Sequence, residues 1–240
     1  MKKICIIIIL ASLFIGNVNA QEFYYENNNG VILTKQEYDK ISEFFWEGYQ
    51  NNLTNEEFTF LKKNGLFENE IRNVELNDNG FNLLSEDIHT TTNKSLKMNA
   101  VCSTNCLVSI SLNWINLPKV RSYDILGIYL DNTSAISIQN VIVETNKGKS
   151  NYSYTNRETN GIGTSFELPK DVEYLRISQT LLVKKKGTIY SSYQHATRSI
   201  SYANSKKYSF SKYGVGGVFS FNAGIQDYYD CMKGVSLNLV

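Results

Sequence analysis

The sequence has few of the residues, and none of the motifs, that mark common catalytic centres. It contains only two histidines, His89 and His195, and they do not form the H-E-x-x-H arrangement of zinc proteases. No G-x-S-x-G segment occurs, which excludes the nucleophile elbow of α/β-hydrolases. The sequence therefore assigns no catalytic residue and predicts no metal site.

Two short segments resemble ligand-binding loops but lack essential residues. Gly148-Lys149-Ser150 matches the end of a P-loop, yet Val143 stands where that motif needs a glycine, and no helical pattern follows. Asn77-Asp78-Asn79-Gly80 lacks the acidic ligands and terminal glutamate of an EF-hand and is a turn signal instead. No bound cofactor is predicted.

Cysteine is also scarce, and Cys5 lies inside the N-terminal apolar segment. The other three are Cys102, Cys106 and Cys231, an odd number that leaves one thiol free or intermolecular in an oxidising compartment. Cys102 and Cys106 can form a disulfide only if the three residues between them turn, because a straight strand would hold them about 13 Å apart. Those residues, Ser103-Thr104-Asn105, favour a turn, so this pair is the first choice. A bridge from Cys231 to either partner, or three free thiols, stays open.

Long apolar runs are missing except at the N-terminus. Residues 1–20 have the pattern of a signal peptide, with Lys2-Lys3 before the apolar Ile4–Ile15 and the small residues Val18 and Ala20 before the cleavage site. The apolar run is too short to span a bilayer comfortably. We therefore expect a secreted, extracellular protein with no transmembrane segment after the signal peptide is removed.

Charge is distributed unevenly along the chain. Residues 21–90 hold 14 acidic and 5 basic residues, whereas residues 91–240 hold 9 acidic and 17 basic residues. The acidic part could dock on the basic part and cancel its field. Alternatively, the basic part could face an anionic partner such as a cell-wall polymer, a glycan or a lipid headgroup.

Two helices are expected in the acidic part, residues 21–90. Thr34 with Glu37, and Thr54 with Glu57, match the capping box that begins a helix. A short Asn51-Asn52-Leu53 connection predicts a helical hairpin. Its aromatic stripe has the spacing of a core face rather than of a ligand shelf.

The opening of this part, YYENNNGVILTKQEYDKISEFFWEGYQNNLTNEEF over residues 24–58, has paired tyrosines, an Asn/Gly turn and the segments Gly-Tyr-Gln and Leu-Thr. It resembles an uncharacterised family of small secreted proteins of low-GC Gram-positive bacteria. The resemblance implies secretion by a bacterium and implies no activity.

A mainly β domain is predicted for residues 91–240, after a polar linker near residues 88–100. From Leu107 the sequence alternates, with Val108, Ile110, Leu112 and Trp114 on one side and serines on the other, as in a strand with one buried face. Further short strands follow without helical periods between them. This succession predicts an antiparallel β-sandwich of jelly-roll or immunoglobulin-like type, preceded by the helical hairpin.

A basic and aromatic surface is the best candidate for binding. The stretch 182–213 combines lysines and arginine with tyrosines and many serines, which suit contact with phosphate, carboxylate or glycan groups. The candidate ligand-binding residues are Lys184, Lys185, Lys186, Tyr190, Tyr193, Arg198, Tyr202, Lys206 and Lys207. Lysine-rich hairpin tips also protect β proteins from edge-to-edge pairing, and this structural interpretation stays open.

Together these features favour a secreted, non-enzymatic protein that binds an anionic polymer or a glycan at a cell surface. Nucleic acid is not an expected partner of a secreted protein. A membrane-active or pore-forming protein is the first alternative. A hydrolase that pairs His195 with one of the cysteines is the second.

Overall fold

The computed structural model describes residues 23–46, 48–67, 83–102, 104–214, 217–221, 224–230, 232 and 234–239. The predicted signal peptide and Cys231 lie outside the described residues. The chain divides into two compact units, Met1–Asp78 and Asn79–Val240.

The described part of the first unit contains two short strands and two α-helices. Its elements are β1 (Tyr24–Glu26), β2 (Ile32–Thr34), α1 (Lys35–Phe44), the 3-10 helix η1 (Tyr49–Asn52) and α2 (Asn55–Lys63). Both predicted capping boxes are confirmed, because Thr34 and Thr54 accept from the backbone N–H of Glu37 and Glu57, and each glutamate accepts from its cap in return. The aromatic stripe is largely buried, with Phe44, Phe45 and Tyr49 inside. The packing of the two helices as a hairpin stays a prediction.

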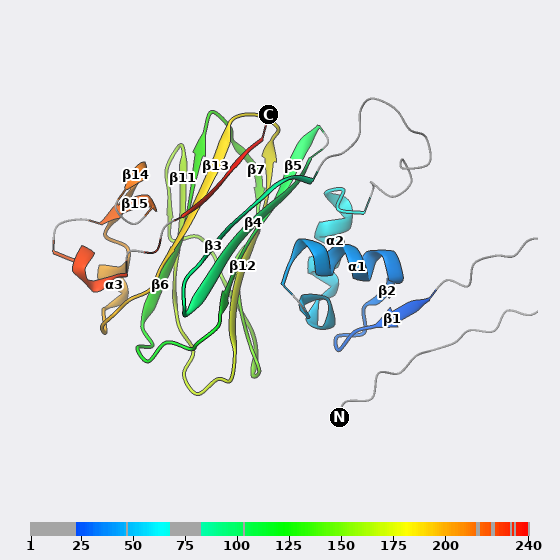
Figure 1. Ribbon diagram of the computed structural model, residues 1–240, viewed down its shortest axis with the longest axis horizontal. Coiled ribbons are helices and arrows are strands. Elements are labelled where there is room, and N and C mark those ends of the chain that lie inside the picture. The colour runs from blue at the N-terminus through cyan, green and yellow to red at the C-terminus, as the bar shows by residue number, and fades with distance from the viewer. Residues whose placement is uncertain are drawn as a thin grey trace, which may run out of the picture. The chain divides into compact units, whose positions relative to one another are not determined.

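The second unit is mainly β, as predicted, and its two large antiparallel sheets form two layers (Figure 1). The seven-stranded sheet has the order β3-β4-β5-β12-β8-β9, with β7 also paired to β12. Its strands are β3 (Leu83–Thr90), β4 (Lys94–Cys102), β5 (Asn105–Trp114), β7 (Ala135–Ile138), β8 (Val141–Thr145), β9 (Gly148–Tyr152) and β12 (Leu175–Lys184). The five-stranded sheet has the order β10-β11-β6-β13-β16. Its strands are β10 (Asn156–Arg157), β11 (Gly161–Glu167), β6 (Tyr123–Asp131), β13 (Thr188–Gln194) and β16 (Val235–Asn238).

One apolar core lies between these sheets and contains residues of both. Val108, Ile110, Leu112 and Trp114 of β5 belong to it, which confirms the predicted core face. Ser109 is buried on the opposite face as well, so that face is not exposed as predicted. This arrangement is that of a β-sandwich, while its assignment to the jelly-roll or immunoglobulin-like type stays a prediction.

The predicted disulfide between Cys102 and Cys106 is confirmed. The two cysteines are register partners at the end of the β4–β5 hairpin, with their Cα atoms 4.0 Å apart. The bridge therefore closes the end of the β4–β5 hairpin.

The predicted linker near residues 88–100 is wrong, because this segment belongs to β3 and β4. Polar residues there made it resemble a loop, yet Lys94 and Asn99 are buried within β4. Lys94 is neutralised by an ion pair with Asp230, which is 136 residues away in sequence. A partner far away in sequence therefore allows a polar side chain to be buried in a strand. The local sequence pattern contains no sign of that partner, so the strand was missed.

A small hairpin covers the outer face of the five-stranded sheet. It consists of β14 (Tyr208–Gly214) and β15 (Gly217–Phe221), preceded by the short helix α3 (Tyr202–Ser205) and followed by the 3-10 helix η2 (Gln226–Tyr228). Its aromatic rings lie directly on glycines of the sheet: a Cβ on Gly127 would overlap the ring of Phe219. These glycines allow the close approach that builds a second apolar cluster outside the sandwich.

Candidate functional site

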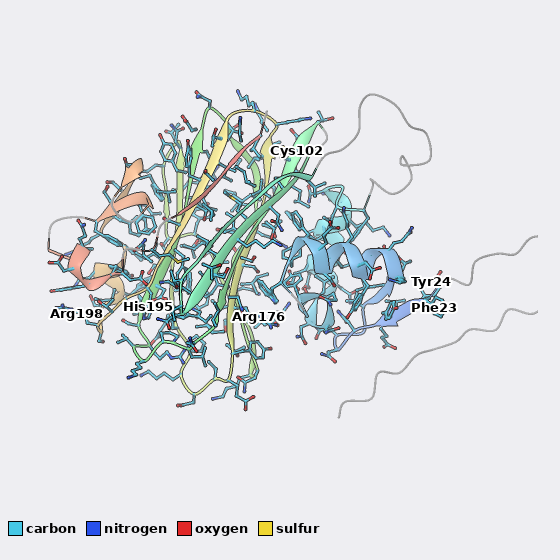
Figure 2. The ribbon with its side chains drawn as sticks, viewed as in Figure 1. Phe23, Tyr24, Cys102, Arg176, His195 and Arg198 are labelled. Carbon is cyan, nitrogen blue, oxygen red and sulfur yellow. A yellow bond between two sulfur atoms is a disulfide. The ribbon has the colours of Figure 1, made fainter. Side chains whose placement is uncertain are left out.

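The residues predicted to form one basic and aromatic surface lie at two ends of the sandwich. Lys184 ends β12 as the register partner of Asn105 near the disulfide, and Lys185 and Lys186 follow in the turn to β13; all three lysines are exposed. The exposed Arg198 and the residues of α3 follow the opposite end of β13. Figure 2 shows Cys102 and Arg198 at these two ends. A seven-residue strand separates the groups by about 20 Å, so they do not form one contact surface.

The two tyrosines of β13 face opposite sides of its sheet. Tyr190 is half-buried on the outer face, where its ring lies 6.4 Å from that of Tyr129. Tyr193 is fully buried in the core, and its hydroxyl donates to Asp124 and accepts from Nε1 of Trp114. Burial and the Asp124 carboxylate raise the pKa of Tyr193 well above its usual value. The prediction that Tyr193 belongs to an exposed surface is therefore wrong: alternation along β13 turns it inward, and a buried carboxylate satisfies its hydroxyl.

The remaining predicted residues cluster on and around α3. Tyr202, Lys206 and Lys207 are exposed, and the helix is fixed to the sandwich by polar contacts. The Ser165 hydroxyl on β11 donates to the Ser205 hydroxyl at 2.6 Å, and both oxygens are buried. Such buried contacts hold this single helical turn against β11 and give Tyr202 a defined position.

A groove of about 530 Å³ lies beside α3. Four tyrosines line it, together with serine, threonine and asparagine residues: Tyr123, Tyr152, Tyr154, Tyr202, Asn151, Ser153, Thr155 and Ser165. They come from β6, β9, β11, the segment after β9 and α3, so elements distant in sequence meet here. The groove combines aromatic surface with many hydroxyl groups, which is the composition of adaptable binding sites.

Basic side chains lie over two of these rings. Nζ of Lys206 is 3.8 Å from the ring centroid of Tyr202, and the Arg157 guanidinium is 5.8 Å from that of Tyr154. Glu167 is the acidic residue that lines the groove. Burial is the main cause that raises the pKa of Tyr152, so its hydroxyl stays neutral and able to donate at physiological pH.

Sequence reasoning found Tyr202 and Lys206 but missed the opposite wall of the groove. Tyr152 and Tyr154 line the groove from a polar segment, NYSYTNR, about 50 residues upstream of α3, and Arg157 of the same segment lies over the Tyr154 ring. The available signal was the pair of tyrosines two residues apart, which places two aromatic rings on one side of an extended chain. Nothing local indicates that this segment lies beside α3.

The structure also limits the hydrolase alternative. Cys102 and Cys106 are bonded to each other, so neither is a free nucleophile for His195. Pairing with Cys231 stays a prediction, because Cys231 lies outside the described residues. His195 instead contacts Asp124, with Nδ1 at 3.0 Å from a carboxylate oxygen.

In the described parts of the chain, no group of three or more histidine, cysteine or acidic residues is arranged to hold a metal ion. Across the same residues, no helix has the length and apolar character needed to cross a membrane.

Comparisons with known proteins add little to this geometry. No family model and no curated protein matches the chain. A solved chain described under "pH-induced modulation of Streptococcus parasanguinis adhesion by Fap1 fimbriae" is 15% identical, with a TM-score of 0.30, over 67% of this chain and 90% of that one. A likeness at that TM-score supports no argument about fold or function. Membership of the secreted Gram-positive family thus stays a prediction.

Proposed function

We propose that this protein is a secreted, non-enzymatic binding protein that recognises an anionic or glycan component of a cell surface through the groove beside α3. One observation supports this site above others: Tyr154 and Tyr202 are 46% and 42% exposed on the groove, and each has a basic side chain beside its ring.

Exposed tyrosines suit a ligand that presents both apolar and hydroxyl surface. A tyrosine ring offers a flat apolar face, and its hydroxyl exchanges hydrogen bonds with polar groups at the rim. Two rotatable bonds fix each ring, so ordering it on binding costs little entropy. Asn151, Ser153 and Thr155 supply further donors and acceptors along the same wall. A saccharide ring has this mixed surface.

The basic side chains favour an acidic substituent on that ligand. Lys206 and Arg157 place positive charge at Tyr202 and Tyr154, while the single acidic lining residue is Glu167. Lysine provides a point charge for carboxylate, phosphate or sulfate, and arginine provides a bidentate fork for the same groups. A glycan with an acidic group therefore matches the groove better than a neutral one.

A glycan array with neutral and acidic members, followed by titration of the hits, tests this proposal. We expect Tyr202→Ala and Lys206→Ala each to weaken binding roughly tenfold, as expected for a central aromatic or charged contact. Both side chains are exposed, so the variants should melt at the wild-type temperature.

The matched control is Lys184→Ala/Lys185→Ala/Lys186→Ala, which removes exposed positive charge at the other end of the sandwich. This triple variant should bind as wild type does. Loss of binding in the triple variant alone would move the site to the β12–β13 turn. If neither the array nor pull-down with anionic polymers detects binding, the function itself is contradicted. The membrane-active alternative stays a prediction and would show itself as dye release from liposomes.

A further inference from the structure

A second recess, separate from the groove, opens at the same end of the sandwich. It has a volume of about 660 Å³, and its lining includes Lys94, Trp114, His195 and Asp230, which we call its floor. Lys94 begins β4, Trp114 ends β5, and His195 follows the end of β13, so the recess lies where strands of both sheets end. Figure 2 shows His195 at this end of the sandwich.

The buried Asp124 carboxylate fixes the orientation of the His195 ring through its Nδ1 atom. Nδ1 lies 3.0 Å from both carboxylate oxygens, and the same carboxylate accepts from the backbone N–H of Ala196 and from the Tyr193 hydroxyl. A carboxylate only accepts, so the neutral imidazole carries its hydrogen on Nδ1. In this neutral tautomer Nε2 is a hydrogen-bond acceptor, and among the described residues it has no hydrogen-bond partner.

The other charges of the floor are balanced in place. Lys94 is 4% exposed, pairs with Asp230 and has its ammonium 5.1 Å from the Trp114 ring centroid. Asp230 also accepts from the backbone N–H of His195 at 3.0 Å, while its side chain keeps 29% exposure. The floor therefore presents two acceptors, Nε2 of His195 and the Asp230 carboxylate, while the exposed Lys119 adds a positive charge to the lining of the recess.

We propose that this recess binds a neutral ligand rich in hydroxyl groups, such as a single saccharide or another polyol, with one hydroxyl donated to Nε2 of His195. Its volume lies within the usual range for small-molecule sites. Neighbouring hydroxyl groups can donate to the two acceptors, and the side chains of Leu117, Val120 and Met232 provide apolar walls. The two acceptors of the floor favour a ligand that donates hydrogen bonds over an anion, which only accepts them.

Tryptophan fluorescence can report occupancy because the chain has two tryptophans and one of them, Trp114, lines the recess. Trp46→Phe removes the other emitter, whose Nε1 has no hydrogen-bond partner to lose. The probes are glycerol, methyl glucoside, methyl mannoside and N-acetylglucosamine, titrated into the Trp46→Phe protein. We expect a saturable change in Trp114 emission with a dissociation constant on the order of millimolar for at least one sugar, as for a small site with few contacts.

Two substitutions at position 195 separate a ligand contact from a structural role. His195→Asn keeps an amide N–H near the position of Nδ1, where it can still donate to Asp124, but has no atom at Nε2. His195→Gln places an amide group near Nε2 and can retain an acceptor there. We expect His195→Asn to weaken binding at least tenfold while melting close to wild type, and His195→Gln to retain part of the affinity.

A third variant leaves the buried network untouched. Thr197 is exposed at the rim of the recess, so Thr197→Trp in the Trp46→Phe protein should block entry without changing Asp124 or His195. For this variant, equilibrium dialysis against labelled sugar replaces fluorescence, and binding should be lost. The proposal is overturned if no probe binds at tens of millimolar, or if the Asn and Trp variants bind as the parent does. Failure here leaves groove binding unaffected, since that is measured with Tyr202 and Lys206 variants.

Discussion

The imidazole of His195 and the carboxylate of Asp124 meet in the core although 71 residues separate them, with Nδ1 3.0 Å from each oxygen. Asp124 is completely buried, and the Tyr193 hydroxyl and the Ala196 backbone N–H complete its contacts. A buried carboxylate is tolerated when donors satisfy it, and here three donors do so. This pair links the start of β6 to the end of β13, and His195 lines the recess.

Asp124→Asn should destabilise the protein strongly. The amide keeps one oxygen but turns an N–H₂ group toward donors that need an acceptor, which leaves buried groups unsatisfied. We expect a loss of about 3 kcal/mol in the free energy of unfolding, measured by urea denaturation. Asp171→Asn is the matched control, because Asp171 is exposed with φ 56°, a conformation that asparagine also adopts readily. The control should stay within about 0.5 kcal/mol of wild type, and an equal loss in both variants would contradict this account of Asp124.

Local sequence patterns predicted those parts of the fold that depend on neighbouring residues. The alternation through Val108, Ile110 and Leu112 identified a core strand because the side-chain period of a strand is two residues. The helix starts at Thr34 and Thr54 were found because a capping box spans only four residues. The Cys102–Cys106 bridge was predictable because three intervening residues restrict the geometry.

Contacts between residues far apart in the sequence could not be predicted from local patterns. Lys94 looked like a linker residue because its partner, Asp230, is 136 residues away. Tyr193 looked like a surface residue because a tyrosine on a polar, alternating strand has two possible faces, and only the position of Asp124 decides between them. Only one side of the groove was predicted, for the same reason. Its residues on and beside α3 belong to one short segment, whereas Tyr152 and Tyr154 come from a distant segment that the fold brings to the groove.

The Lys94–Asp230 ion pair should show strong coupling in a double-mutant cycle. Asp230→Asn leaves the ammonium of Lys94 buried without its counter-ion, and we expect this to cost about 3 kcal/mol. Lys94→Met removes that charge and keeps an unbranched side chain against Trp114, so Lys94→Met/Asp230→Asn should be less destabilised than the sum of the single variants by 1 kcal/mol or more, about the size seen for coupled buried pairs. Urea denaturation of all four proteins provides the cycle, and additive effects would show that the pair is not coupled.

Gly127→Ala should destabilise the hairpin that covers the five-stranded sheet. A Cβ at this position would overlap the ring of Phe219, which is fully buried and cannot move without disturbing the cluster. Overpacking of this kind costs about 1–3 kcal/mol. Gly127→Ala/Phe219→Leu should recover part of that loss because the smaller side chain makes room for the added methyl group. No recovery in the double variant would mean that the glycine is needed for another reason.

Alkaline pH should destabilise the protein through Tyr208. Burial raises the pKa of Tyr208 from 10.0 to about 12 in the folded protein, so the folded state holds the phenolic proton more tightly than the unfolded chain does. Its stabilising contribution is complete below pH 10 and is lost as the pH rises through 12. A shift of this size corresponds to roughly 3 kcal/mol. Tyr208→Phe cannot ionise at this position. Its free energy of unfolding, followed by urea denaturation at pH values between 7 and 12, should therefore fall less steeply than that of wild type.

Tyr193 and Tyr229 also have raised pKa values, chiefly through burial, so some loss of stability at alkaline pH should remain in the variant. Parallel curves for the two proteins would show that Tyr208 ionises as readily in the folded protein as in the unfolded chain, and would contradict the burial of its side chain between β14 and the five-stranded sheet.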